Sequence, residues 1–251
     1  MLVGTADLQA LATRAPRLEH FATEPLALVG VEVFQACFEM RAASREPLLP
    51  AGLHPTNPAT LIALAWRCAE SPWGPFSLVQ IRVGCRSGVR TRGFVVAAAC
   101  DRVDAAAALA TRWGLAARPA RIALARRYDG CALGVELEGR SALSIEARDP
   151  EPLAPGDVQF TGTLTLAHTP LGLRLVQLEP RVALSRVERV RPRLLGFDAL
   201  AWGPGALTPY HPVSASIGVG SIEIPPVRFV CRPDVLAFQG TEPVRQDSLS
   251  R

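Results

Sequence analysis

Hydrophobic and polar residues alternate with a period of two over much of the chain, which predicts a protein built mainly from β-strands. The runs richest in β-forming residues cover residues 26–40, 59–68, 76–83, 89–100, 122–128, 132–137, 142–147, 158–167, 173–179, 182–190 and 221–231. Residues 59–68 are mostly apolar, so their periodicity leaves both a buried strand and a helix open. Asp129-Gly130 and Glu138-Gly139 separate three of these runs and are typical of hairpin turns.

Two segments have helical spacing instead. Residues 7–15 place Leu8, Leu11 and Ala12 on one face, and residues 104–111 form an alanine-rich run. Many short strands, few helices and 22 prolines indicate one β-rich domain closed around a pocket. We expect this domain to cover residues 1–238 and the polar tail, residues 239–251, to be disordered.

The link from the second helix to the following strand reads Arg112-Trp113-Gly114-Leu115-Ala116-Ala117-Arg118-Pro119. It resembles the signature of the acetoacetate decarboxylase family, in which a Trp-Gly or similar pair leads into an aromatic residue, a proline and two adjacent lysines. The resemblance is clearest over residues 47–125 and recurs at Trp202-Gly203-Pro204-Gly205. It implies a mainly β (α+β) fold, with a mixed and mainly antiparallel sheet closed into a double-psi-like barrel or cone. Peripheral helices and a homo-oligomer are also implied.

The catalytic amine of that family is missing from this chain. By the resemblance, Leu115 stands at the aromatic position, Ala116 at the proline, Ala117 at the Schiff-base lysine and Arg118 at its neighbour. All 27 residues of the Lys+Arg total are arginine. A Schiff base needs an amine that is neutral near pH 7, and a guanidinium does not lose its proton in a protein. A one-residue register shift at Pro119 would not restore a lysine, so we expect no decarboxylation by the family mechanism.

A second motif, Gly74-Pro75-Phe76, begins the strand at residue 76. Two residues after this aromatic the family carries a glutamate that orients the substrate, and here that position is Leu78. Leu78, Gln80 and Arg82 share one face of the predicted strand. If Leu78 lines the cavity, we expect Gln80 to line it as well and Arg82 to lie at the rim. The alternative is that this face meets solvent.

Arg118 is the candidate catalytic residue, because a permanent cation in a pocket clamps a carboxylate or an enolate oxygen. The alternative is a side chain that has left the cavity. Trp113 also fits a packing role at the helix–strand corner. The residues expected to bind substrate are Phe76, Leu78, Gln80, Arg82, Trp113, Leu115 and Ala117.

Composition excludes several other classes of function. The net charge is +4, but the arginines are scattered and aromatics make up only 6%, which argues against a nucleic-acid partner. The six cysteines form no CxxC pair and indicate buried, reduced thiols, and no ligand spacing predicts a metal or other cofactor. The sequence shows neither a signal peptide nor a long apolar run, so we expect a cytoplasmic protein. A lysine-free, alanine-rich chain is typical of a GC-rich bacterial genome.

Two functions fit these observations. The first is a repurposed enzyme that acts on a small β-keto or polyketide-like substrate, by aldol, dehydration or cyclisation chemistry in secondary metabolism, without an imine. The second is a non-catalytic protein that binds a small molecule. Two or more titratable groups converging in the cavity would favour the enzyme, and a purely apolar cavity would favour binding or shape-driven cyclisation.

Overall fold

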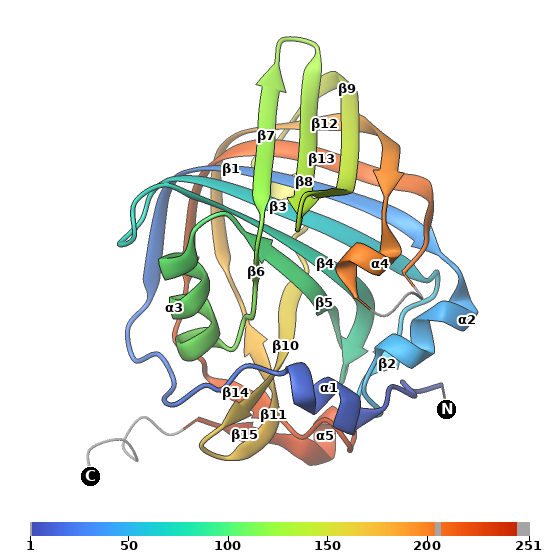
Figure 1. Ribbon diagram of the computed structural model, residues 1–251, viewed down its shortest axis with the longest axis vertical. Helices are drawn as coiled ribbons and strands as arrows, with labels where there is room; N and C mark the ends of the chain where they lie inside the picture. Colours follow the sequence, from blue (N-terminus) through green and yellow to red (C-terminus); the bar gives the residue numbers. More distant parts are fainter. Residues whose placement is uncertain (1, 204–206, 245–251) are drawn as a thin grey trace.

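The computed structural model describes residues 2–203 and 207–244, and within them 15 strands form one sheet (Figure 1). The strands are β1 (Leu26–Met40), β2 (His54–Pro55), β3 (Thr60–Glu70), β4 (Phe76–Ser87), β5 (Arg90–Cys100), β6 (Arg118–Pro119), β7 (Arg121–Arg127), β8 (Gly130–Leu137), β9 (Arg140–Leu153), β10 (Gly162–Thr169), β11 (Gly172–Leu178), β12 (Arg181–Phe197), β13 (Pro209–Ile224), β14 (Phe229–Cys231) and β15 (Thr241–Pro243). The helices are α1 (Leu8–Arg14), α2 (Ala42–Arg45), α3 (Val103–Trp113), α4 (Ala199–Trp202) and α5 (Ala237–Gly240), with single 3-10 turns η1 (Glu46–Leu48) and η2 (Pro155–Asp157).

The strands follow one continuous path. Its order is β15-β14-β11-β10-β5-β4-β3-β1-β13-β12-β9-β8-β7, with β2 paired to β4 and β6 paired to β5 beside it. The pairings are antiparallel except β10 with β5 and β5 with β6, which are parallel. The sheet is therefore mixed and mainly antiparallel, as predicted. Its path has two ends, at β15 and β7, so the predicted closure into a barrel is not confirmed.

The central strands are apolar on both faces because the curved sheet packs on each side (Figure 1). In β4 every residue from Phe76 to Cys85 is buried. Alternate side chains of this strand enter two different clusters: Val79 and Ile81 belong to the larger one, and Leu78 belongs to the smaller one. Helix α3 covers the smaller cluster with Leu109 and its neighbours. A strand buried on both faces is mostly apolar, and this part of β4 is so except at Ser77, Gln80 and Arg82, which are buried with it.

Most predicted elements are present, and the first is exact: β1 has the predicted bounds of 26–40. Residues 59–68 prove to be strand rather than helix, because they form most of β3. The predicted strand at 221–231 is instead divided between the end of β13 and β14. Strand β13 begins as early as Pro209 and includes His211, which the sequence placed in a loop.

The C-terminal prediction also needs correction. The expected domain boundary at residue 238 falls inside α5, and β15 follows it and pairs with β14. The part of the tail at 239–243 is thus attached to the sheet, and residues 245–251 lie outside the described residues. No helix in the described part of the chain has both the length and the apolar character needed to cross a membrane.

Candidate functional site

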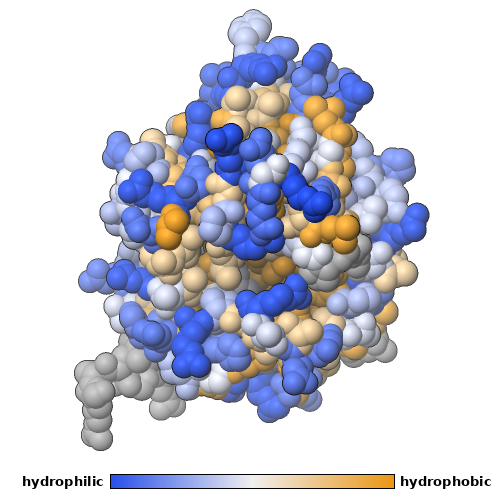
Figure 2. Space-filling model, viewed as in Figure 1, coloured by the Kyte–Doolittle hydropathy of each residue, from blue (hydrophilic) through white to orange (hydrophobic). Residues whose placement is uncertain are grey.

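A cavity of about 610 Å³ lies where β5 and β10 separate. The two strands pair only at Arg92–Phe94 and Gly162–Leu164, and β5 next pairs on that side with β6, at Ala99 and Cys100. Residues 95–98 of β5 lie between these two pairings and border the cavity. Figure 2 shows a hollow at the centre of one face, between polar side chains, in the region that α1, α4 and β5 border in Figure 1.

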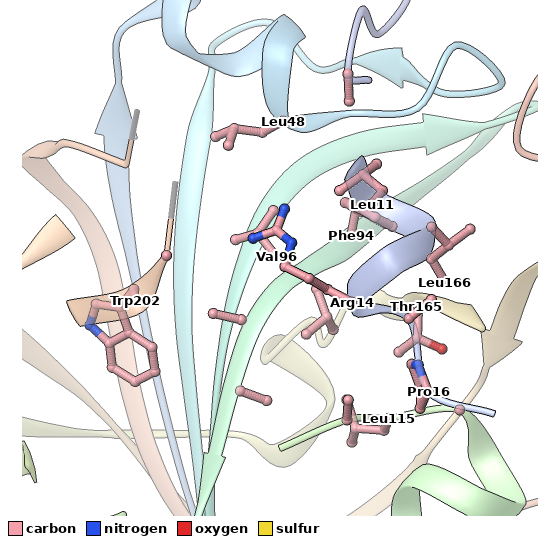
Figure 3. A pocket seen from close by; sticks show the side chains of 18 of the residues that line it. Leu11, Arg14, Pro16, Leu48, Phe94, Val96, Leu115, Thr165, Leu166 and Trp202 are labelled. Atoms are coloured by element: carbon pink, nitrogen blue, oxygen red, sulfur yellow. The ribbon is translucent and has the colours of Figure 1, made fainter. Parts of the chain in front are cut away.

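Apolar side chains from five elements form most of the cavity wall (Figure 3). They include Leu11 of α1, Leu48 of η1, Phe94 and Val96 of β5, Leu166 of β10 and Trp202 of α4. The indole of Trp202 is held in place because its Nε1–H donates to the carbonyl of Ala142 over 2.9 Å. Asp198 caps the helix that carries this indole, accepting the backbone N–H of Leu200 and Ala201 at 3.0 and 3.2 Å. The wall suits the apolar body of a small organic molecule.

The turn after α3 brings the predicted signature to this cavity. Gly114 ends the helix with a φ of 68°, and the N–H groups of Gly114 and Leu115 donate to Ala110 and Leu109 over 3.1 and 3.0 Å. A side chain at Gly114 would also place its Cβ 2.9 Å from the Cβ of Ala167. Both the left-handed backbone and the close approach require glycine, and together they direct residues 115–118 along the cavity.

Two arginines stand at the cavity mouth. The Arg118 side chain is exposed and its Nη2 donates to the carbonyl of Ala201, which connects the signature to α4. Arg14, the last residue of α1, extends toward the middle of the cavity (Figure 3). A carbon added to Gly203 would meet Arg14 Nη1 at 3.5 Å, so this guanidinium lies against the end of α4. The mouth therefore carries two cations that keep their charge at any physiological pH.

The remaining polar groups of the cavity are a carboxylate and a hydroxyl. Asp7 lies at the mouth, where its Oδ1 accepts the N–H of Gln9 and Ala10 at 2.9 and 3.3 Å and caps α1. Thr165 of β10 is 3% exposed, and its Oγ1 has no hydrogen-bond partner among the described residues. This oxygen is almost fully covered by protein atoms, so it lies in the wall near Gly114 and does not face the open cavity.

Some side chains suited to general acid–base or covalent catalysis lie away from this cavity. Among the described lining residues, Asp7 supplies the one carboxylate, and none supplies an imidazole, a thiol or an amine. The cysteines are free, and burial raises the pKa of Cys85 to about 12 and that of Cys100 to about 11. No group of three or more His, Cys, Asp and Glu gathers in the described residues. The cavity is equipped to hold an anion more than to move a proton.

The structure separates the predicted site residues into three places. Leu115, Ala117 and Arg118 line the 610 Å³ cavity. Phe76, Leu78 and Trp113 do not line this cavity and are buried in the smaller core cluster, to which Leu115 also belongs.

Gln80 and Arg82 occupy the third place. They share the face of Leu78, as predicted, but both are buried, at 1% exposure, and neither lines the 610 Å³ cavity. The expectation that Arg82 lies at a rim is therefore wrong, because β4 is covered on both sides.

Sequence reasoning missed half of the cavity. Leu11 and Arg14 come from a helix whose apolar spacing was visible, but spacing does not show which surface a helix packs against. Thr165 lies on a strand that was predicted without a partner, and its parallel pairing with β5 joins segments far apart in the chain. The family resemblance did include Pro47 and Trp202, and both line the cavity. Pro204 and Gly205 of the late motif lie outside the described residues.

Comparison with known proteins reveals a structural likeness without a sequence match. No protein-family model matches the chain, and no curated protein matches it in sequence. Acetoacetate decarboxylase from Legionella pneumophila superposes with a TM-score of 0.71 at 18% identity, over 84% of this chain and 90% of that one. The fold is that of acetoacetate decarboxylase.

Two further structures of this fold are similar. The enduracididine biosynthesis enzyme MppR, complexed with pyruvate, has a TM-score of 0.68 at 16% identity, over 90% of this chain and 93% of its own. An acetoacetate decarboxylase-like enzyme from Sphingomonas wittichii RW1 has a TM-score of 0.61 at 15% identity, over 83% of this chain and 96% of its own. These likenesses establish the acetoacetate decarboxylase-like fold, and its chemistry has to be argued from the residues of this chain.

Proposed function

We propose that this protein binds a small organic carboxylate of the β-keto or polyketide-like class in the 610 Å³ cavity, without forming an imine. The observation that carries the proposal is the pairing of an apolar wall with two arginines at its mouth. Guanidinium groups bind carboxylates through paired, charge-assisted hydrogen bonds, and the apolar wall takes up the rest of the molecule.

The positions of the two guanidiniums define the expected pose. Arg14 comes from α1 and Arg118 from the signature segment, and both approach the end of α4. A carboxylate placed between them would contact both cations while its chain extends toward Phe94 and Leu166.

A repurposed enzyme is the second candidate. One structure of this fold, MppR, was determined with the condensation product of pyruvate and imidazole 4-carboxaldehyde, so the fold accommodates products of carbon–carbon bond formation. In this chain Arg118 would stabilise an enolate oxygen during an aldol, dehydration or cyclisation step in secondary metabolism. Binding is the better-supported function, because the one carboxylate among the described lining residues, Asp7, is already engaged as a helix cap.

The proposal is tested by isothermal titration with acetoacetate, pyruvate and longer β-keto acids, each beside its methyl ester. We expect the acids to bind and the esters to bind at least tenfold more weakly, since a charge-assisted contact contributes about 1.5–3 kcal/mol. Arg14→Gln and Arg118→Gln should each remove this preference. Arg127→Gln is the matched control, because Arg127 ends β7 at the hairpin that stands at the top of Figure 1.

Equal binding of acids and esters, or no binding of either, would contradict the proposal. Catalysis is tested separately by following the α-carbon protons of a bound β-keto acid by NMR in heavy water. Exchange faster than in free solution, and lost in Arg118→Gln, would favour the enzyme over the binding protein. The homo-oligomer implied by the resemblance stays a prediction, which analytical ultracentrifugation measures.

A further inference from the structure

Arg82 is a buried cation that no carboxylate of the described residues pairs with. Its side chain is 1% exposed. Nε and Nη2 donate to Gln80 Oε1 over 3.0 and 2.7 Å, and Nη1 donates to the carbonyl of Thr161 over 3.3 Å. These contacts use three of the five N–H groups of a guanidinium. Among the described residues, no carboxylate forms an ion pair with Arg82, whereas several exposed arginines have such a pair.

The charge is present at neutral pH. Burial lowers the pKa of Arg82 to about 9, which still leaves the guanidinium protonated at pH 7. A buried charge is stable only when it is paired and hydrogen-bonded, because it has lost its hydration. The neutral oxygens of Gln80 and Thr161 supply hydrogen bonds and no counter-charge.

A small cavity of about 50 Å³ lies against this guanidinium. Trp66, Thr161 and Thr163 line it together with Arg82. Trp66 Nε1 and the hydroxyls of both threonines are buried and have no hydrogen-bond partner among the described residues. An indole N–H can only donate and a hydroxyl can donate, so the residues around the small cavity hold three donors that have no protein acceptor among the described residues.

Strand geometry explains how these groups meet. Thr163 pairs with Gly93 at the parallel junction between β10 and β5. A side chain at Gly93 would place its Cβ 2.9 Å from Arg82 Cδ and 3.5 Å from Thr161 Oγ1, so the glycine lets the arginine pass and brings the hydroxyl close. The donors are thus positioned by β3, β4 and β10, with Gly93 of the intervening β5 leaving room for them, and not by mobile surface side chains.

The one carboxylate that borders the small cavity is already engaged. Glu179 forms an ion pair with Arg92, and its side chain is 46% exposed. Arg92 Nε is itself buried without a partner, so the neighbourhood holds more positive than negative charge. A volume of about 50 Å³ has room for a species the size of one or two water molecules.

We propose that this small cavity is a binding site for a monatomic anion of the size of chloride, held by Arg82, Trp66 and Thr163. The anion supplies the missing counter-charge and accepts hydrogen bonds from the guanidinium, the indole and the hydroxyl. Because these donors belong to β4, β3 and β10, the bound anion ties the start of β10 to the rest of the sheet.

The test is thermal unfolding of the full chain in sodium chloride and in sodium gluconate at equal ionic strength. Chloride at about ten times its dissociation constant should raise the midpoint by roughly 4 °C over gluconate, since it binds the folded state alone. Arg82→Met should abolish the difference. Trp66→Phe, which leaves Arg82 and Gln80 intact, should reduce it.

Trp113→Phe is the matched control, because this buried indole donates to the carbonyl of Pro225 over 3.3 Å and lies outside the small cavity. It should keep the full chloride response even if it lowers stability. A bromide-soaked crystal should show one anomalous peak beside Arg82. Equal midpoints in the two salts, an unchanged response in Arg82→Met, or a crystal with only water beside the guanidinium would each overturn the proposal.

Discussion

Arg118 stands exposed beside a cavity of about 610 Å³, whereas Arg82 is 1% exposed beside one of about 50 Å³. The first cavity has an apolar wall and its cations at the mouth, where a ligand can enter and exchange. The second has polar donors around a buried cation. We therefore propose that the same type of side chain serves ligand affinity in one region and stability of the folded state in the other, according to its burial.

Removing the partner of the buried arginine should produce the largest effect. Gln80→Leu leaves the Arg82 charge without two of its hydrogen bonds, and we expect a loss of about 3 kcal/mol in the free energy of unfolding. Urea denaturation measures it. Gln177→Leu, on half-buried Gln177 of β11, is the control and should cost less than about 1 kcal/mol. The double variant Gln80→Leu/Arg82→Met should recover most of the loss, and a purely additive result would contradict a coupled pair.

The second-largest effect should come from changing Gly114, in the turn that directs residues 115–118 along the large cavity. Gly114→Ala forces a Cβ into a left-handed residue and against Ala167, so we expect a loss of about 2–4 kcal/mol. Gly139→Ala is the matched control, because Gly139 has a φ of 77° with no atom within 4 Å of an added Cβ. It should cost about 1 kcal/mol. Equal losses in chemical denaturation would show that crowding at Ala167 is unimportant.

The exposed arginine should affect affinity and leave stability nearly unchanged. Arg118→Gln should weaken carboxylate binding about tenfold while changing the free energy of unfolding by less than about 0.5 kcal/mol. Calorimetry and urea denaturation on the same preparation measure both. Carboxylate affinity should also fall as salt rises, since exposed charges are screened. A large stability loss with unchanged affinity would reverse the comparison between the two arginines.

Restoring an amine should give the smallest effect, a partial gain of covalent reactivity. Ala117→Lys places a lysine on the cavity wall beside Arg118, whose charge favours the neutral amine. Borohydride reduction with acetoacetate should then trap an adduct visible by mass spectrometry. The parent chain has no lysine, so its background comes from the N-terminus alone. Ala107→Lys, on the exposed face of α3, is the control. Equal trapping in both variants would show that the cavity wall does not promote formation of the adduct.

Local pattern was enough to locate some strands even where their partners are distant. The strand at 26–40 was predicted exactly because a run of β-forming residues follows Pro25, although it pairs with β13 near the other end of the chain. The start of β13 was not predicted, because its prolines donate no backbone hydrogen bond and prolines in a sequence usually indicate a loop. In the structure Pro212 pairs with Phe38 at a register shift, where an irregular ladder tolerates it.

The site was predicted in part for a similar reason. The signature segment identified Leu115, Ala117 and Arg118 as neighbours of a cavity, because they lie within one short segment that resembles the family signature. The face shared by Leu78, Gln80 and Arg82 also followed from the period of two. The sequence did not show which cavity this face of β4 borders. Both faces of β4 are buried, and alternation along the sequence does not distinguish one buried face from the other.

The short parallel junction between β5 and β10 affects the order in which the chain folds and where the folded protein opens transiently. It joins Arg92–Phe94 to Gly162–Leu164, and the chain between these segments includes β7, β8 and β9. Forming the junction therefore costs the entropy of closing a long loop and gains only a few contacts. We expect β10, β11, β14 and β15 to assemble late and to exchange amide hydrogens as one unit. Because the large cavity lies in the fork beyond this junction, transient opening of that unit would give a bulky ligand a path that the closed structure does not offer.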